Sequence, residues 1–156
     1  GCMAGKGKIK GVSVKKQQAA FEKATREGFK KALQLWQRVF APGHFEPSAR
    51  GKYGYRRRTA KYERRKKREK GHNVPLVWSG DSRRTVKTRF ATPTVRKSRK
   101  GGFFTIRLNL GVRLFGRQDE LTETTETEMD TMAEEALKSV DRAISARGNT
   151  EETRVR

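Results

Sequence analysis

Residues 50–100 limit the fold of this chain more than any other stretch, because they hold 20 Lys and Arg against 3 Asp and Glu. Within them, residues 56–70 carry ten basic side chains and two Glu. Like charges repel one another at helical spacing, and so polar a stretch cannot supply a core. The sequence therefore predicts a small fold with a basic arm, residues 41–73, whose counter-charges lie outside its own subunit.

The end of the chain has the opposite sign. Residues 119–156 hold 11 acidic and 5 basic side chains, although the whole chain has a net charge of +21. This segregation indicates a polyanionic partner for the basic block, or subunits that pack the basic arm of one chain on the acidic helix of the next. The two arrangements are compatible with each other.

The length of 156 residues, of which 33% are hydrophobic, is typical of one domain with a modest core. We place this domain at residues 13–148 and expect flexible termini at residues 1–12 and 149–156. No run approaches the roughly 18 to 20 apolar residues of a membrane span, so we expect no membrane partner.

The sequence predicts a long amphipathic helix over residues 12–40. Apolar residues from Phe21 to Phe40 recur at steps of three and four, which describes one helical face. Ser13 is the expected N-cap. The aromatic end of this face, at Trp36 and Phe40, is interpreted as core rather than as a base-stacking surface.

A second amphipathic helix is predicted over residues 128–146. Its apolar stripe includes Met129, Met132, Val140 and Ile144, with acids near its start and arginines near its end, as the helix dipole favours. Gly148 is the expected end of the helix.

The basic arm combines a loop and a charged helix. Residues 41–55 contain two prolines and three glycines without periodicity, which predicts a loop ordered by itself or by a partner. Residues 57–70 are good helix formers with almost no apolar face, followed by Gly71.

A small antiparallel hairpin is predicted between the arm and the last helix. Val86, Thr88 and Phe90 alternate with basic residues, and apolar side chains alternate again over residues 104–110, after a loop at residues 97–102. Residues 79–82 are typical of a turn that opens a short turn of helix or a strand. The expected fold is α+β, with the N-terminal and C-terminal helices packed on this sheet.

The sequence predicts no catalytic site, no metal site and no cofactor. Cys2 is the only cysteine, and His44 and His72 stand in polar stretches without metal-ligand spacing. The turn at Ser79 lacks the frame of a nucleophile elbow. We therefore expect a protein that is not an enzyme.

Residues 44–86 resemble a segment of small tailed-bacteriophage proteins of the head–tail joining or tail-completion (neck) family. The resemblance rests on an aromatic and proline loop, a Tyr-Gly-Tyr basic stretch, a Lys-Tyr charged segment and a Pro-Leu-Val/Ser-Gly/Arg sequence that opens into sheet. Here these elements are His44-Phe45, Tyr53-Gly54-Tyr55, Lys61-Tyr62, Pro75-Leu76-Val77, Ser79-Gly80 and Arg83-Arg84. Asp81-Ser82 departs from the more apolar residue that is common in that family.

The resemblance implies a structural virion protein, assembled in the host cytoplasm, that forms a ring in the head–tail connector. The implied partners are further copies of the chain, the portal or adaptor, and the tail tube or tail terminator. A head-to-tail contact between identical subunits closes into a ring when its rotation divides a full turn. Basic side chains that no neighbour covers are able to face the phosphates of packaged DNA, without reading its sequence.

Two sets of residues are the candidate contact surfaces. The basic-arm set, for subunit or nucleic-acid contact, comprises Tyr53, Tyr55, Arg56, Arg57, Arg58, Lys61, Tyr62, Arg64, Arg65, Lys66, Lys67 and Arg68. The acidic counter-surface comprises Glu123, Glu126, Glu128, Asp130, Glu134 and Glu135.

The alternative interpretation is a ribosomal or other RNA-binding protein. Tyrosines interleaved with arginines, at Tyr53, Tyr55 and Tyr62, are suited to stacking on bases. The acidic amphipathic helix at the C-terminus favours the ring, because a protein that coats RNA does not need it.

Overall fold

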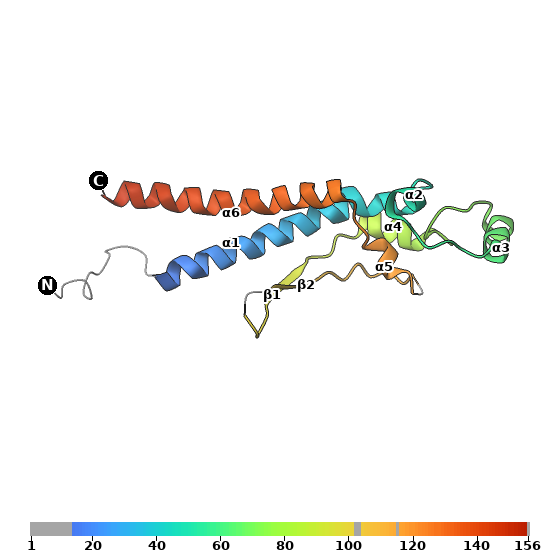
Figure 1. The fold of residues 1–156 in the computed structure, drawn as a ribbon, viewed down its shortest axis with the longest axis horizontal. Coiled ribbons are helices and arrows are strands. Elements are labelled where there is room, and N and C mark those ends of the chain that lie inside the picture. Colours follow the sequence, from blue (N-terminus) through green and yellow to red (C-terminus); the bar gives the residue numbers. More distant parts are fainter. Residues whose placement is uncertain (1–13, 102–103, 115, 156) are drawn as a thin grey trace.

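The computed structural model describes residues 14–101, 104–114 and 116–155, with side chains described up to residue 146. Figure 1 shows two long helices, at residues 14–35 and 126–155, that extend from a smaller head. The head contains the short helices of residues 49–88 and 118–121, and the basic helix of residues 60–70 lies at its far end. The elements in chain order are α1 (Val14–Leu35), α2 (Ala49–Tyr53), α3 (Ala60–Lys70), α4 (Asp81–Thr88), β1 (Thr94–Lys97), β2 (Phe104–Arg107), α5 (Gln118–Leu121) and α6 (Glu126–Val155). These elements confirm the expected α+β class.

Helix α1 confirms the predicted N-terminal helix and continues without a break into the head. A π-helical segment, Trp36–Phe40, and a 3-10 segment, Ala41–Phe45, follow it directly. The predicted cap at Ser13 lies outside the described residues, as does the predicted flexible segment 1–12.

Helices α1 and α6 pack side by side through small residues (Figure 1). The buried positions of α1 are Ala24, Gly28 and Ala32, which recur every four residues and lie on one face. A Cβ atom on Gly28 would lie 2.5 Å from the carbonyl oxygen of Ala136 in α6. The two backbones therefore approach more closely than larger side chains would allow.

The rotation of α6 differs from the one that its apolar pattern predicts. Met132 and Val140 are half-buried, whereas Met129, Leu137 and Ile144 are 53%, 59% and 56% exposed. The backbone also continues as helix through Gly148 to Val155, so the predicted end at Gly148 is wrong and residues 149–155 are helical. A helix tolerates an interior glycine at a cost of about 1 kcal/mol.

The core of the head is built by residues far apart in the sequence. Trp36 and Phe45, which follow α1, pack with residues from four later segments of the chain. The fully assembled cluster is Trp36, Ala41, Phe45, Val77, Val86, Leu114 and Leu121. The prediction that Trp36 is core is confirmed, since it is only 4% exposed.

The hairpin exists, but its first strand lies later than predicted. Strand β1 pairs antiparallel with β2, with Val95 opposite Ile106 and Lys97 opposite Phe104. Residues 86–88, predicted as strand, belong instead to α4, where Val86 is the single buried residue. The turn at residues 79–80 starts this helix, and α4 places Val86 in the core without the period of a strand.

The sheet packs on α1 through β1 and through the ring of Phe104, which lies 5.8 Å from the ring of Phe29. Val95 is buried, but Ile106 is 38% exposed, so the predicted apolar face of the second strand is only partly covered. Lys97 also pairs with Glu22 of α1 at 2.5 Å. The hairpin is thus a short flap on α1 rather than a platform for both long helices.

Candidate functional site

A cleft of about 860 Å³ opens in the head beside α3. Its walls come from the basic arm, from residues 75–85 and from residues 111–117. Asp81 is the only carboxylate among the described residues that line it. The cationic lining residues are Arg50, Arg57, Arg58, Arg65, Lys66, Arg83, Arg113 and Arg117. We call this feature the cationic cleft.

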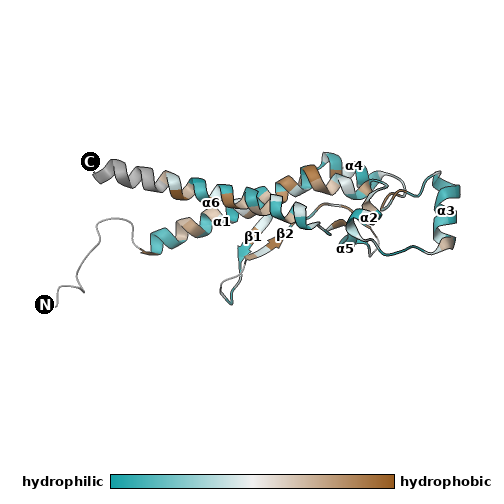
Figure 2. Cartoon of the chain, turned by 45° about the horizontal axis from the view of Figure 1, so that its top comes forward, coloured by the Kyte–Doolittle hydropathy of each residue, from teal (hydrophilic) through white to brown (hydrophobic). Residues whose placement is uncertain are grey.

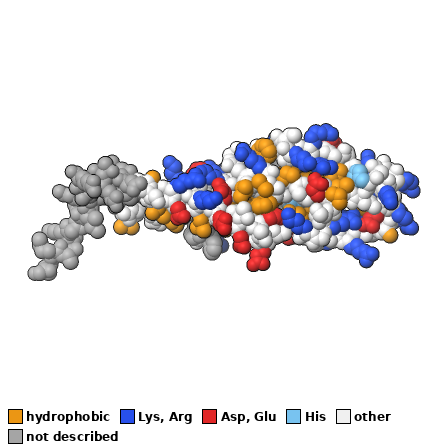
Figure 3. All heavy atoms as spheres, turned by 90° about the horizontal axis from the view of Figure 1, so that it is seen from above, with side chains coloured by type: hydrophobic (Ala, Val, Ile, Leu, Met, Phe, Trp, Pro, Cys, Tyr) orange, Lys and Arg blue, Asp and Glu red, His pale blue; other side chains and the backbone are white. Residues whose placement is uncertain are grey.

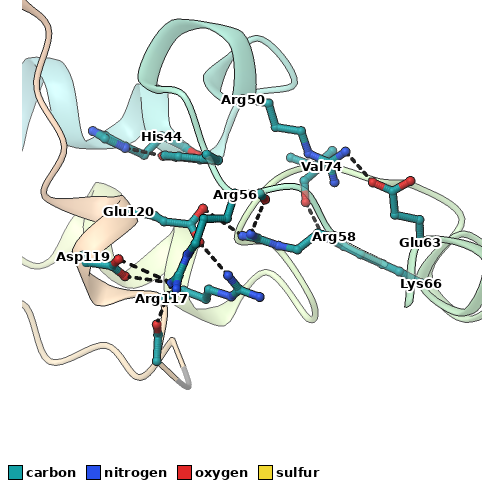
Figure 4. Close-up of polar contacts among 12 residues, drawn as sticks. His44, Arg50, Arg56, Arg58, Glu63, Lys66, Val74, Arg117, Asp119 and Glu120 are labelled. Atoms are coloured by element: carbon teal, nitrogen blue, oxygen red, sulfur yellow. Dashed lines mark hydrogen bonds and ion pairs between the residues drawn. The ribbon is translucent and has the colours of Figure 1, made fainter. Parts of the chain in front are cut away.

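One buried carboxylate holds two of the arginines that line the cationic cleft, Arg58 and Arg117. The side chain of Glu120 is 4% exposed and lies 3.0 Å from Arg58, 3.0 Å from Arg117 and 3.7 Å from Arg56. Figure 4 shows these arginines converging on Glu120. A buried charge needs such partners, so the three guanidinium groups are held in place by a residue that is 62 positions from Arg58 along the chain. The prediction that the counter-charges of the basic arm lie outside its own subunit is therefore wrong for Arg56 and Arg58, which pair with the acidic end of their own chain.

Helix α3 is fixed to the head by two further contacts. Arg50 donates a 2.7 Å hydrogen bond to Glu63, and Lys66 donates one to the backbone oxygen of Val74 (Figure 4). Burial and, to a smaller extent, the nearby charges of Arg50 and Arg58 together lower the pKa of the Lys66 amine to about 8. The expectation that this helix has no core face is therefore wrong at Lys66.

An aromatic pair closes one side of the cleft. The rings of Tyr62 and Trp78 lie 6.1 Å apart, and both residues line the cavity. Arg65 and Lys70 lie 5.6 Å and 5.4 Å from the Trp78 ring centre, which is cation–π distance.

Helix α3 consequently has two different faces. The side towards the cleft carries the contacts of Tyr62, Arg65 and Lys66. The opposite side, the outer face of α3, comprises Lys61, Arg64, Lys67 and Arg68, which are exposed and make no ion pair with a described residue. Figure 2 shows α3 as a mostly hydrophilic helix set apart at the end of the head.

Two of the predicted contact tyrosines pack against a buried histidine, and one of them is itself buried. Tyr53 is buried and donates a 2.9 Å hydrogen bond to Glu128, and its ring stacks on His44 at 3.7 Å. The Tyr55 hydroxyl hydrogen-bonds with Nδ1 of His44. Tyr53 and Glu128 are therefore corrected from surface contacts to core contacts, and His44, expected in a polar loop, is fully buried.

Burial changes the titration of this cluster. Burial is the main cause that lowers the pKa of His44 to about 4, and it also raises the pKa values of Tyr53 and Tyr55. Glu128 opposes the shift of His44, whereas Lys52, 3.9 Å from Glu128, adds to it. The cluster thus holds a neutral histidine and two neutral tyrosines at pH 7.

The predicted acidic counter-surface is only partly a surface. Glu128 is buried, and Glu135 is half-buried and pairs with Lys138 at 3.8 Å. The other four acids are exposed and make no ion pair with a described residue. They are Glu123, Glu126, Asp130 and Glu134.

Three of these acids share one face of α6 with exposed apolar side chains. Residues 126, 130 and 134 recur every four positions, and exposed Met129, Ala133 and Leu137 lie next to them. We call Glu126, Met129, Asp130, Ala133, Glu134 and Leu137 the outer face of α6. Figure 3 shows acidic, basic and hydrophobic side chains interspersed along the body of the molecule, with several basic side chains at its α3 end.

Several residues of the cleft are not among the predicted contact residues. Arg83, Arg113 and Trp78 enter the cleft because the fold brings residues 75–85 and 111–117 next to the arm. Arg117 stands three residues before Glu120, a spacing that indicates an ion pair on one helical turn. This spacing was the one available clue to the buried carboxylate.

No group of three or more His, Cys, Asp or Glu residues among those described is arranged to hold a metal ion. None of the described helices is long and apolar enough to cross a membrane. No family model, curated protein or solved structure matches the chain.

Proposed function

We propose that this chain is a structural subunit of a ring in the head–tail connector of a tailed bacteriophage. The observation that carries the proposal is the presence of two unneutralised surfaces of opposite sign on one chain. The outer face of α6 is acidic and apolar, and the outer face of α3 is basic. Neither finds its counter-charges within the described part of its own chain.

The separation of the two faces favours a head-to-tail contact over a symmetric pair. They lie on different elements, with α3 beyond the head and α6 along the body (Figure 1). A contact between different patches of identical subunits is heterologous, and it closes into a ring when the rotation divides a full turn. Exposed apolar residues such as Leu137 add burial to that contact, whereas the charges add specificity.

The resemblance of residues 44–86 to neck proteins indicates the assembly to which the proposed ring would belong. It implies the portal or adaptor on one side of the ring and the tail tube or tail terminator on the other, in the virion. Packing contacts of this kind need no chemistry at a reacting centre, so the proposed role is not enzymatic.

The RNA-binding alternative has less support than the ring. Of the three tyrosines on which it depends, Tyr53 is buried and Tyr55 is held against His44. Only Tyr62 is exposed, at 38%.

The decisive experiment is the mass of the purified protein, alone and with its neighbouring virion proteins, by light scattering and negative-stain microscopy. We expect a ring of defined size. The variant R64E/R68E, on the outer face of α3, should prevent ring formation while the subunit keeps its melting temperature. The control R96E/K100E changes the same charge on exposed residues of the hairpin segment and should leave the ring intact.

A charge swap makes the test specific. A subunit with D130K/E134K on α6 should also fail alone, but R64E/R68E combined with D130K/E134K should recover rings, because the two faces again carry opposite charges. A chain that stays monomeric with every neighbouring protein, or rings that form equally well in all variants, would refute the proposal.

A further inference from the structure

We propose that the cationic cleft binds a single strand of nucleic acid through its sugar-phosphate backbone. The inference goes beyond the ring proposal and does not depend on it, because the cleft lies on the opposite side of α3 from the outer face. The same helix would then serve a neighbouring subunit with one side and a strand with the other.

The cleft retains positive charge after its internal ion pairs are formed. Arg58 and Arg117 share the single carboxylate of Glu120. Three more lining arginines have one carboxylate each, in the pairs Arg50–Glu63, Arg65–Glu69 and Arg83–Glu46. Arg57 and Arg113 line the cleft, are exposed, and make no ion pair with any described residue. The field of the arginines is felt by the buried amine of Lys66, whose pKa falls to about 8, chiefly by burial and then by Arg50 and Arg58.

The kind and placement of the cations favour phosphate. Seven of the eight cationic lining residues are Arg, whose planar guanidinium binds phosphate oxygens in pairs and is weakly hydrated. They come from three separate segments of the chain, so they form an array around a cavity of about 860 Å³ rather than one point of charge. An array of this size suits several linked phosphates better than one small anion.

The aromatic side of the cleft favours a single strand over a duplex or an acidic peptide. Trp78 and Tyr62 line the same cavity as the arginines. Aromatic faces beside a cationic groove are the arrangement by which proteins hold unpaired bases, because every base has a face that stacks on them. Paired bases in a duplex, or the carboxylates of a peptide, would place no base on these rings, whose other contacts are with each other and with cations of α3.

The two tryptophans make binding directly observable. Trp36 is 4% exposed in the core, whereas Trp78 lines the cleft. We expect a 12-nucleotide oligothymidine to change tryptophan emission of the full chain, and the W78F variant to lose that change. Anisotropy of a fluorescein-labelled oligothymidine gives the affinity in parallel, at two salt concentrations.

The critical variant is R57E/R113E, because both side chains face the cleft and neither holds a buried carboxylate. We expect it to bind oligothymidine at least about tenfold more weakly than wild type and with a shallower salt dependence. The matched control is R64E/R68E, which makes the same charge change on the other side of α3 and should stay within about threefold of wild type. Thermal melts of both variants check that they remain folded.

Each remaining outcome decides the proposal. Equal losses in the two variants would show general electrostatic attraction and overturn the cleft as the site. Equal affinity for a duplex of the same length, or for polyglutamate, would overturn the assignment to a single strand. Since D130K/E134K should abolish rings yet bind oligothymidine normally, failure of this inference is distinguishable from failure of the ring proposal.

Discussion

At the scale of single residues, the head is organised by buried charges that a sequence reading assigns to solvent. Glu120, Glu128 and Lys66 are each nearly inaccessible, yet each has a polar partner. Removing Glu120 would leave the guanidinium of Arg58, itself 9% exposed, without its carboxylate. Uncompensated buried charges cost several kcal/mol, so these residues act as structural ties between the arm and the body.

The buried histidine gives the protein a pH-dependent stability. Because the pKa of His44 is about 4 in the folded chain and about 6.5 when free, the unfolded chain binds its proton first as the pH falls. The contribution of neutral His44 is complete above about pH 6.5 and is lost towards pH 4, at up to about 1.4 kcal/mol per pH unit. We expect urea unfolding between pH 7 and pH 4.5 to show this slope.

The His44 prediction needs a comparison of slopes, because other groups titrate in the same range. The variant H44Q should flatten the pH dependence between pH 6.5 and 4.5. The variant V86A is the control, since it weakens the core without removing a titratable group. Parallel slopes in wild type and H44Q would contradict the assignment.

At the scale of elements, the close approach of α1 and α6 depends on one glycine. The variant G28A places a methyl group against the Ala136 carbonyl, 2.5 Å from its oxygen. We expect this overlap to lower the free energy of unfolding by about 1 to 3 kcal/mol, although alanine is the better helix former by about 1 kcal/mol. Chemical denaturation monitored by circular dichroism measures the change.

Gly51 provides the matched control for Gly28. It also lies in a helix, α2, but a Cβ atom there would meet no atom within 4 Å. The variant G51A should therefore be neutral or slightly stabilising. A stabilised G28A would mean that the two helices do not cross at this point.

The elements that periodicity predicts well are those that carry an amphipathic face of their own. Helix α1 lies within its predicted range for this reason. Helix α3 has almost no apolar face, and its range was predicted instead from its strong helix formers and from Gly71, which ends it. The strand predicted at residues 86–90 was wrong because three alternating positions, Val86, Thr88 and Phe90, are too few to distinguish a strand from a short helix. The buried face of α6 was predicted wrongly because small residues, which carry little hydrophobic signal, form the contact of α6 with α1.

At the scale of the whole molecule, the long helices α1 and α6 make the protein elongated (Figure 1). Helix α6 has 30 residues, which corresponds to about 45 Å. A compact domain of 156 residues would have a radius of gyration of about 15 Å. We expect small-angle X-ray scattering of the monomer to give a clearly larger radius of gyration. A value of about 15 Å would contradict the extended arrangement of α1 and α6.

The fold class and the separation of basic and acidic residues along the chain could be predicted from the sequence, but the cleft could not. The charge counts predicted a basic arm and an acidic last helix, and both lie on exposed elements. The cleft depends on Arg58 meeting Glu120 and on Trp78 meeting α3. Such contacts between distant segments leave no periodic trace, so only the three-dimensional arrangement reveals them.

The start of α1 and the end of α6 lie at the same end of the molecule, opposite α3 (Figure 1). A fluorophore, affinity handle or tether attached at that end would stand a full helix length away from the cationic cleft. Chains immobilised on a sensor surface in this way would present their arginines uniformly to the solution. The architecture is therefore well suited to oriented single-molecule measurements.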